Sequence, residues 1–237
     1  MKLLKNFVVF TTVILGVNSL PLEGASLLIT SIGTDLELND AFTQIDFVGE
    51  GRIGDRGGAA TFEVDIGSDT GAPADTDQFN WPNGGSVAFA LSYDAGSNVA
   101  SLTVGTETVS YQPLSTSFDS FAIRARATKA NSFAQLSNLS LDLSGNVTAI
   151  TQQVLAVGSG TGLDILMISN VPGLSNGFTL SGTTVFSWDP QNQPRNSQLA
   201  YQVKVGEAIP EPSTYALLLL SSIAGLIAYR KKRITTG

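Results

Sequence analysis

Cysteine and histidine are both absent from this chain of 237 residues. Without cysteine there can be no disulfide framework, so the stability of the fold must come from packing. The two absences together exclude a Ser-His-Asp triad, a cysteine nucleophile and a zinc site built from histidine or cysteine. Charge is also scarce, at 14% of the residues.

The few charges are distributed unevenly along the chain. Between Ser26 and Ala208 there are 7 Lys and Arg against 18 Asp and Glu, a net charge of −11, whereas the whole chain carries only −7. The remaining basic residues therefore cluster at the two ends. An acidic body lacks the basic surface that nucleic acid requires, so we expect no nucleic-acid partner. It suits an exported domain kept apart from anionic surfaces.

The first 25 residues have the pattern of a secretory signal peptide. Lys2 and Lys5 form a positive region, and Phe7 to Val17 is an apolar stretch too short to span a bilayer. Ser19, Gly24 and Ser26 each end a plausible small-residue cleavage site. The pattern predicts export through the Sec translocon and removal by signal peptidase. The alternative is a buried N-terminal helix.

The chain ends with a second targeting pattern, in residues 209–233. Residues 215–229 carry no charge, and as a helix they would measure about 22 Å against about 30 Å of hydrocarbon. The residues predicted to form this short transmembrane helix include Tyr215, Leu217, Leu218, Leu219, Leu220, Ile223, Leu226, Ile227 and Tyr229. Arg230, Lys231, Lys232 and Arg233 follow, and basic residues beside a span stay in the cytoplasm, which places the body outside.

Pro210 and Pro212 flank Glu211 just before this helix. Each proline lacks an N–H, fixes its own φ, and biases the preceding residue toward extended backbone. The segment is therefore predicted to be stiff, extended and unpaired, which is a form that a processing enzyme can hold.

The sequence "IPEPSTYALLLLSSIAGLIAYRKKR" resembles the PEP-CTERM sorting signal, in which a Pro-Glu-Pro motif precedes a short transmembrane helix and an Arg-rich end. Its three parts occur here in order. The resemblance implies recognition near Pro210, Glu211 and Pro212 by an exosortase, a membrane cysteine transpeptidase, with this chain as the substrate. The protein would be anchored in the inner membrane before processing and then reach the cell surface or extracellular matrix. An uncleaved tail anchor is the alternative.

Residues 26–208 have the pattern of an all-β domain. Apolar and polar residues alternate in "TFEVDI", "VAFALSY" and "LAYQVKV", as in half-buried antiparallel strands. Further strands are predicted at 99–104, 120–128, 138–143, 163–168 and 178–186, separated by turn residues. The five-residue loop before 99–104 favours a hairpin with the preceding strand. We expect an antiparallel β-sandwich, jelly-roll or Ig-like, with at most one or two helical turns in "AITQQVLAVG".

Residues 79–111 resemble, in their strand-hairpin pattern, the extracellular domains named choice-of-anchor. The resemblance implies a surface module of unassigned activity.

Three patterns in the body could carry chemistry. "GEGRIG" at Gly49 matches G-x-G-x-x-G, but a loop and a strand follow it where a dinucleotide site needs a helix, so we assign the glycines to a loop.

"DIGSDTGAPADTDQF", with Asp65, Asp69, Asp75 and Asp77, is interpreted as a solvated acidic loop, with calcium as the alternative. Glu63, Glu107 and the aspartates could supply a glycosidase pair, but most are interpreted as surface charges. No cofactor, metal site or catalytic residue is predicted.

Trp81 and Trp188 are the only two tryptophans. An exposed tryptophan could stack on a sugar ring, but we assign both to the core.

Two functions from different classes remain. The first is a non-catalytic exported surface or matrix protein, sorted through its tail and in contact with extracellular polysaccharide. The second is a secreted carbohydrate-binding or carbohydrate-active protein that uses Asp and Glu carboxylates. A cleft with a close carboxylate pair and an exposed aromatic would distinguish the second from the first.

Overall fold

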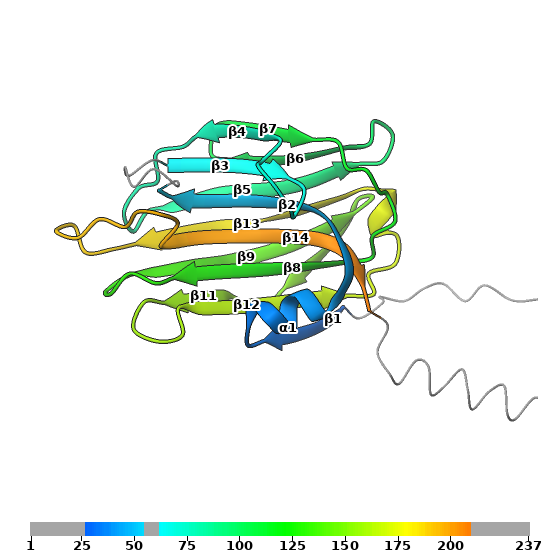
Figure 1. Ribbon diagram of the computed structural model, residues 1–237. Coiled ribbons are helices and arrows are strands. Elements are labelled where there is room, and N and C mark those ends of the chain that lie inside the picture. The colour runs from blue at the N-terminus through cyan, green and yellow to red at the C-terminus, as the bar shows by residue number, and fades with distance from the viewer. Residues whose placement is uncertain (1–26, 55–61, 210–237) are drawn as a thin grey trace, which may run out of the picture.

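The computed structural model describes residues 27–54 and 62–209, and these form two antiparallel β-sheets packed face to face (Figure 1). The strands of the first sheet are ordered β1-β12-β8-β14-β2-β3-β4, and those of the second β10-β9-β13-β5-β6-β7, with β11 also pairing with β9. The predicted all-β sandwich is therefore confirmed. The predicted signal peptide and residues 210–233 of the sorting signal lie outside the described residues.

The first sheet contains strands from the whole length of the body. Their bounds are β1 Leu28–Ile32, β2 Phe42–Ile53, β3 Phe62–Gly67, β4 Asp75–Gln78, β8 Ser120–Ala127, β12 Leu163–Ser169 and β14 Leu199–Ala208. The second sheet is formed by β5 Ser86–Asp94, β6 Val99–Val104, β7 Glu107–Tyr111, β9 Phe133–Leu143, β10 Asn146–Ile150, β11 Val154–Val157 and β13 Phe178–Ser187.

The predicted strands all occur, with small differences at most ends, but the strand predicted at 138–143 is the longer β9, which begins at Phe133. The strand expected at 99–104 is β6, and it pairs with β5 as the hairpin prediction required. Asn98 adopts a positive φ of 55° in the intervening turn, a conformation that asparagine tolerates better than most residues. The expectation of helical turns in residues 149–158 is wrong, because β11 occupies this region and pairs with β9.

The described residues contain one short α-helix, α1 Asp35–Asp40, which the sequence analysis missed, and a 3₁₀ turn, Leu174–Asn176. The Thr34 side chain accepts a hydrogen bond from the Glu37 N–H, and Glu37 accepts one from the Gly33 N–H. The two hydrogen bonds cap the start of the helix, as in a capping box whose Glu reaches one residue beyond the N-cap. Leu38 packs with Phe42 and Met167 in a small cluster on the outer face of the first sheet. No helix among residues 27–54 and 62–209 is long and apolar enough to cross a membrane.

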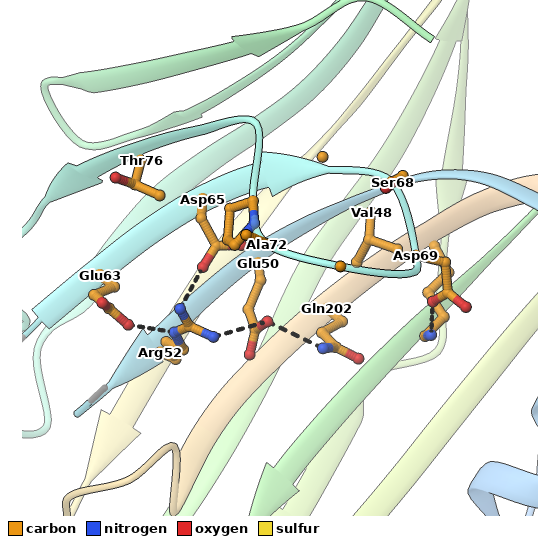
Figure 2. Close-up of a pocket in the computed structure, with 14 residues that line it drawn as sticks. Val48, Glu50, Arg52, Glu63, Asp65, Ser68, Asp69, Ala72, Thr76 and Gln202 are labelled. Carbon is orange, nitrogen blue, oxygen red and sulfur yellow. Dashed lines mark hydrogen bonds and ion pairs between the residues drawn. The ribbon is translucent and has the colours of Figure 1, made fainter. Parts of the chain in front are cut away.

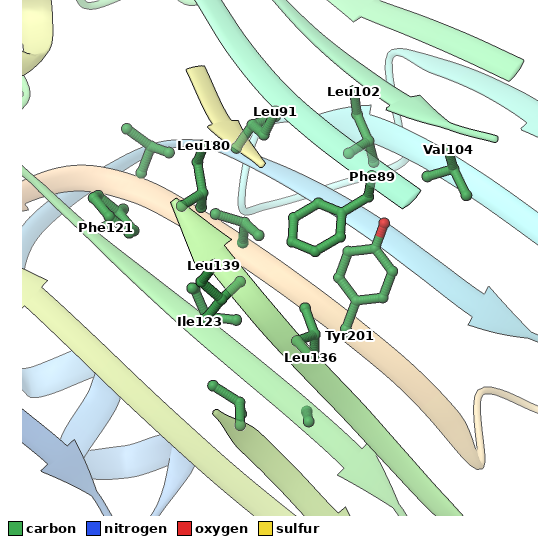
Figure 3. Packing of buried hydrophobic residues seen from close by; sticks show 14 of the residues in the cluster. Phe89, Leu91, Leu102, Val104, Phe121, Ile123, Leu136, Leu139, Leu180 and Tyr201 are labelled. Atoms are coloured by element: carbon green, nitrogen blue, oxygen red, sulfur yellow. The ribbon is translucent and has the colours of Figure 1, made fainter. Parts of the chain in front are cut away.

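The main core lies between the sheets (Figure 3). Leu91 and Leu102 come from the second sheet and Ile123 and Tyr201 from the first, and all four are fully buried. Trp81 is also in the core, at 3% exposure, with its ring 4.6 Å from that of Phe186. Trp188 is half-buried at the border of this core. The assignment of Trp81 to the core is confirmed, whereas Trp188 lies at the rim.

Gly49 and Gly51 of "GEGRIG" lie within β2, not in a loop as predicted, whereas Gly54 follows the end of the strand with a positive φ of 82°. A Cβ atom on Gly51 would lie 2.5 Å from Tyr201 Cε1 and 2.7 Å from Trp81 Cζ2. One on Gly49 would lie 3.1 Å from Leu91 Cδ1. The glycines are therefore required because large side chains of the core approach the β2 backbone closely.

Candidate functional site

The charged side chains of three neighbouring strands meet on the outer face of the first sheet. Glu50 of β2 is directly opposite Asp65 of β3 on one side and Gln202 of β14 on the other. Arg52, two residues further along β2, is opposite Glu63. Because side chains alternate between the two faces of a strand, all five residues project away from the core.

Arg52 is the centre of this group, which we call the Arg52 cluster and define as Arg52, Glu50, Glu63 and Asp65 (Figure 2). Its Nε donates a hydrogen bond to Glu63 Oε2, and its Nη2 lies 2.9 Å from Asp65 Oδ2. Its Nη1 lies 3.6 Å from Glu50 Oε2, which also accepts a hydrogen bond of 3.1 Å from Gln202 Nε2. One guanidinium thus contacts three carboxylates.

Asp65 is the most deeply buried member of the cluster, with 7% of its side chain exposed. Its Oδ2 accepts no aligned hydrogen bond despite the ion pair with Arg52. Burial and the negative charge of Glu50 raise the pKa of Asp65 to about 7, against the opposing effect of Arg52. Near neutral pH, Asp65 is therefore divided between its protonated and its ionised form.

A cavity of about 450 Å³ lies over the cluster, and the segment joining β3 to β4 forms part of its wall. This segment is folded back onto the sheet, because the Ala74 N–H donates to the Ile66 carbonyl at 2.9 Å. Asp69 pairs with Lys204 of β14 at the same wall. The segment is thus tied to the strand at the centre of the sheet.

A second hollow, of about 280 Å³, continues the polar surface toward α1 and shares Glu50, Gln202 and Lys204 with the first. Arg124 of β8 lines it and pairs with Asp35 of α1, through an Nη2–Oδ2 distance of 2.7 Å. This hydrogen-bonded guanidinium holds the pKa of Asp35 below its ordinary value. The first sheet therefore presents a charged outer face running from the β3–β4 segment to α1.

The four aspartates that the sequence placed in one solvated loop have separate roles. Asp65 belongs to β3 and is buried, so the interpretation as a solvated loop is wrong for this residue. Asp69 pairs with Lys204, and Asp75 accepts a hydrogen bond from the Ser110 N–H. Asp77 accepts one from the Gln78 N–H. Within residues 27–54 and 62–209, no three Asp or Glu residues are grouped to hold a metal ion.

Glu63 pairs with Arg52 in the Arg52 cluster. The interpretation of Glu63 as a free surface charge is therefore wrong. Glu107 belongs to β7 of the other sheet, where its carboxylate accepts a hydrogen bond from Thr106. The sequence analysis missed Glu50, Arg52 and Gln202. The alternation in "GEGRI" and "LAYQVKV" puts these residues on the polar side of their strands, but it does not indicate that the strands are neighbours.

The carboxylates of the cluster can be compared with those of a glycosidase. Such an enzyme needs two carboxyl groups on either side of the bond to be broken. Here the three carboxylates contact one arginine. The surface instead presents acceptor oxygens and, when Asp65 is protonated, one carboxyl donor, which suits a ligand rich in hydroxyl groups.

Pro210, Glu211, Pro212, the predicted transmembrane residues and the basic cluster at 230–233 lie outside the described residues. No protein-family model matches the chain, and no curated protein is significantly similar to it.

Proposed function

We propose that this chain is a non-catalytic exported surface or extracellular-matrix protein, sorted and processed through a PEP-CTERM signal. The observation that carries the proposal is the distance in sequence between the last described backbone contact and the Pro-Glu-Pro motif. The last strand, β14, runs to Ala208, and the Ile209 N–H still donates a hydrogen bond of 2.9 Å to the Ala41 carbonyl. The Pro-Glu-Pro motif therefore begins one residue beyond the last backbone contact described.

The position of the first and last described strands supports the same proposal. The start of β1 and the end of β14 lie at one end of the sandwich, beside α1 (Figure 1). Thr30, Ser169 and Ile209 line the same hollow there. The six residues 209–214 can extend by at most about 22 Å. In the membrane-bound precursor the α1 end would thus face the bilayer, and the opposite end would face outward.

The architecture also supports a more specific fold assignment. After β7 the chain crosses between the sheets repeatedly, so that β13 enters the middle of one sheet and β14 the middle of the other. The fourteen described strands exceed both the seven to nine of an Ig-like sandwich and the eight of a jelly roll, so strand number does not separate the two layouts. We favour a jelly-roll-like arrangement because of the repeated crossing between the sheets.

Replacing Pro210, Glu211 and Pro212 together with alanine tests the sorting proposal. Membrane insertion should persist, because the apolar run and the basic end are unchanged. Processing by an exosortase should stop, because the stiff extended segment is lost. Immunoblots of membrane and extracellular fractions, with mass spectrometry of the mature protein, would show an uncleaved form retained in the membrane.

The matched control replaces the neighbouring Ser213 and Thr214 with alanine, and it should be processed like the wild type. If the Pro-Glu-Pro variant and the wild type have equal size and equal membrane retention in a host with an exosortase, the tail is a simple anchor and the proposal is wrong.

One observation favours a second candidate, a secreted carbohydrate-active protein. Asp65, with its raised pKa, lies in a cavity with Glu50 and Glu63, and a raised pKa is typical of a general acid. Hydrolysis of a polysaccharide by the purified chain, abolished by both Asp65→Asn and Glu50→Gln, would establish this candidate. We favour the non-catalytic function because Arg52 contacts all three carboxylates.

A further inference from the structure

The outer face of the second sheet differs sharply from the charged outer face of the first. One cross-strand row there runs Thr108–Thr103–Ala90–Ser181–Ser140, from β7 through β6, β5 and β13 to β9. All five residues are small and uncharged, and all are partly or fully accessible to solvent. By contrast, Arg52, Arg124, Arg126 and Lys204 all line the hollows of the first sheet.

A second row lies next to the first and has the same character. It runs Ser110–Ser101–Ser92–Thr179 across β7, β6, β5 and β13 before it reaches Asp142 of β9. We call these two rows, up to but not including Asp142, the hydroxyl face. In a body with a net charge of −11, an uncharged surface that extends across five strands is the exception.

The hydroxyl groups of this face are hydrogen-bonded in pairs across the strands. Ser101 and Ser110 are 3.0 Å apart between their Oγ atoms, and Ser140 and Ser181 are 2.9 Å apart. Thr103 and Thr108 form a similar pair at 3.0 Å. Each hydroxyl has one donor and two acceptor sites, so each pair keeps one donor and several acceptor sites available. The face can therefore bond to a ligand without first losing these internal contacts.

A hollow of about 390 Å³ borders the first row of the face, on the side away from the second row, and Thr103, Ala90 and Ser181 line it. It lies where the β13 register shifts between Ser181 and Thr183, at Gly182. Ala88, Ala90 and Gly105 line it, and space remains above the backbone because the two alanines carry only a methyl group and Gly105 has no side chain. A bulky substituent of a ligand lying across the strands could enter this hollow.

The composition of the face decides between classes of partner. A stable protein interface is usually anchored by aromatic, methionine or arginine side chains, and the hydroxyl face contains none of these. Nucleic acid needs cations and a membrane surface needs large apolar side chains, and the two rows supply neither. A neutral polymer with many hydroxyl groups is uncharged, as the face is. Its hydroxyl groups can both donate hydrogen bonds to the face and accept hydrogen bonds from it.

We propose that the hydroxyl face binds a neutral polysaccharide chain lying across β6, β5 and β13. The proposal rests on the proposed function in one respect, because export would bring the protein into contact with extracellular polysaccharides. The rows cross five strands, which suits an extended chain held by many weak contacts and does not suit a single enclosed sugar.

Co-sedimentation of the purified full chain, in mild detergent, with microcrystalline cellulose and with chitin tests this proposal. Binding should be retained in 1 M salt, because no charge takes part. Ala88→Glu/Ala90→Glu places one charge in the first row of the face and one in the hollow beside it, and it should weaken binding at least tenfold. The control Thr30→Glu/Gln78→Glu adds the same two charges to exposed positions of the first sheet and should leave binding unchanged. Circular dichroism and melting curves establish that both variants fold.

Three results would overturn the proposal. The wild type could fail to bind either polymer, or a folded Ala88→Glu/Ala90→Glu variant could bind as well as the wild type. In the third, sedimentation would show a dimer of the wild type that this variant abolishes, which assigns the face to a second copy of the chain. None of these measurements depends on export or processing, so a failure here is distinct from failure of the sorting proposal.

Discussion

Asp75, on the edge strand β4 of one sheet, accepts a hydrogen bond of 2.9 Å from the backbone N–H of Ser110, on the edge strand β7 of the other. On the opposite side of the sandwich, Asp164 of β12 accepts a bond of 2.7 Å from the Leu155 N–H of β11. In each case a carboxylate accepts a hydrogen bond from a backbone N–H group of an edge strand. Such groups would otherwise be available to pair with another chain.

We expect Asp75→Ala to lower the free energy of unfolding by about 1 kcal/mol, because an exposed hydrogen bond of this kind contributes that order of stability. Asp75→Asn should lose less than half as much, since its amide oxygen can still accept. Urea denaturation measures both variants. Equal losses for the alanine and asparagine variants would show that the bond to Ser110 contributes nothing.

Gly51→Ala should destabilise the protein by about 1–3 kcal/mol through overpacking. Its new methyl group would lie between the rings of Tyr201 and Trp81, which cannot move without disturbing the core. Gly160→Ala is the control, because its Cβ would meet nothing closer than the Val157 carbonyl oxygen at 3.9 Å. Thermal unfolding compares the two. A Gly51→Ala protein as stable as the control would contradict the close packing over β2.

Asp65 should make the stability of the protein depend on pH. Its pKa is about 7 in the folded state, against an ordinary value of 3.8. Between these two values the folded state keeps a proton that the unfolded state has released. The free energy of unfolding should therefore fall as pH rises from about 4 to about 7 and remain low above that range.

Asp65→Asn cannot ionise, so it should lack this decline. The stability of the variant relative to the wild type should rise across the same pH range, by an amount on the order of 4 kcal/mol. Urea denaturation at a series of pH values from 4 to 8.5 measures the difference. A difference that does not change with pH would mean that Asp65 titrates as an ordinary carboxyl group.

The mature protein should lack its first ~19 to ~26 residues, because the apolar stretch from Phe7 to Val17 is too short to anchor the chain. N-terminal sequencing of protein recovered from its host measures the start directly. A chain that begins at Met1 would support the alternative of a buried N-terminal helix.

The alternation of side chains, together with the turn residues, was sufficient to predict eight strands and the class of the fold, but it missed short strands such as β4 and β11. "VAFALSY" and "LAYQVKV" carry their large apolar residues at every second position, and this pattern predicts which side of a strand is buried whatever lies next to it. The hairpin of β5 and β6 was also predictable, because its two strands are joined by a short turn. Helix α1 was missed because its six residues bury only Leu38.

By itself, then, the sequence determined which residues face the core and which face solvent, together with the targeting patterns predicted at the two ends. Only the tertiary structure decided which polar residues meet. Glu50 and Gln202 are 152 positions apart, yet they are opposite one another on neighbouring strands. Ser140 and Ser181 of the hydroxyl face are also distant in the sequence and opposite one another on neighbouring strands. Alternation specifies the face of a strand but not its neighbour, because strand order depends on how the whole chain packs around one core.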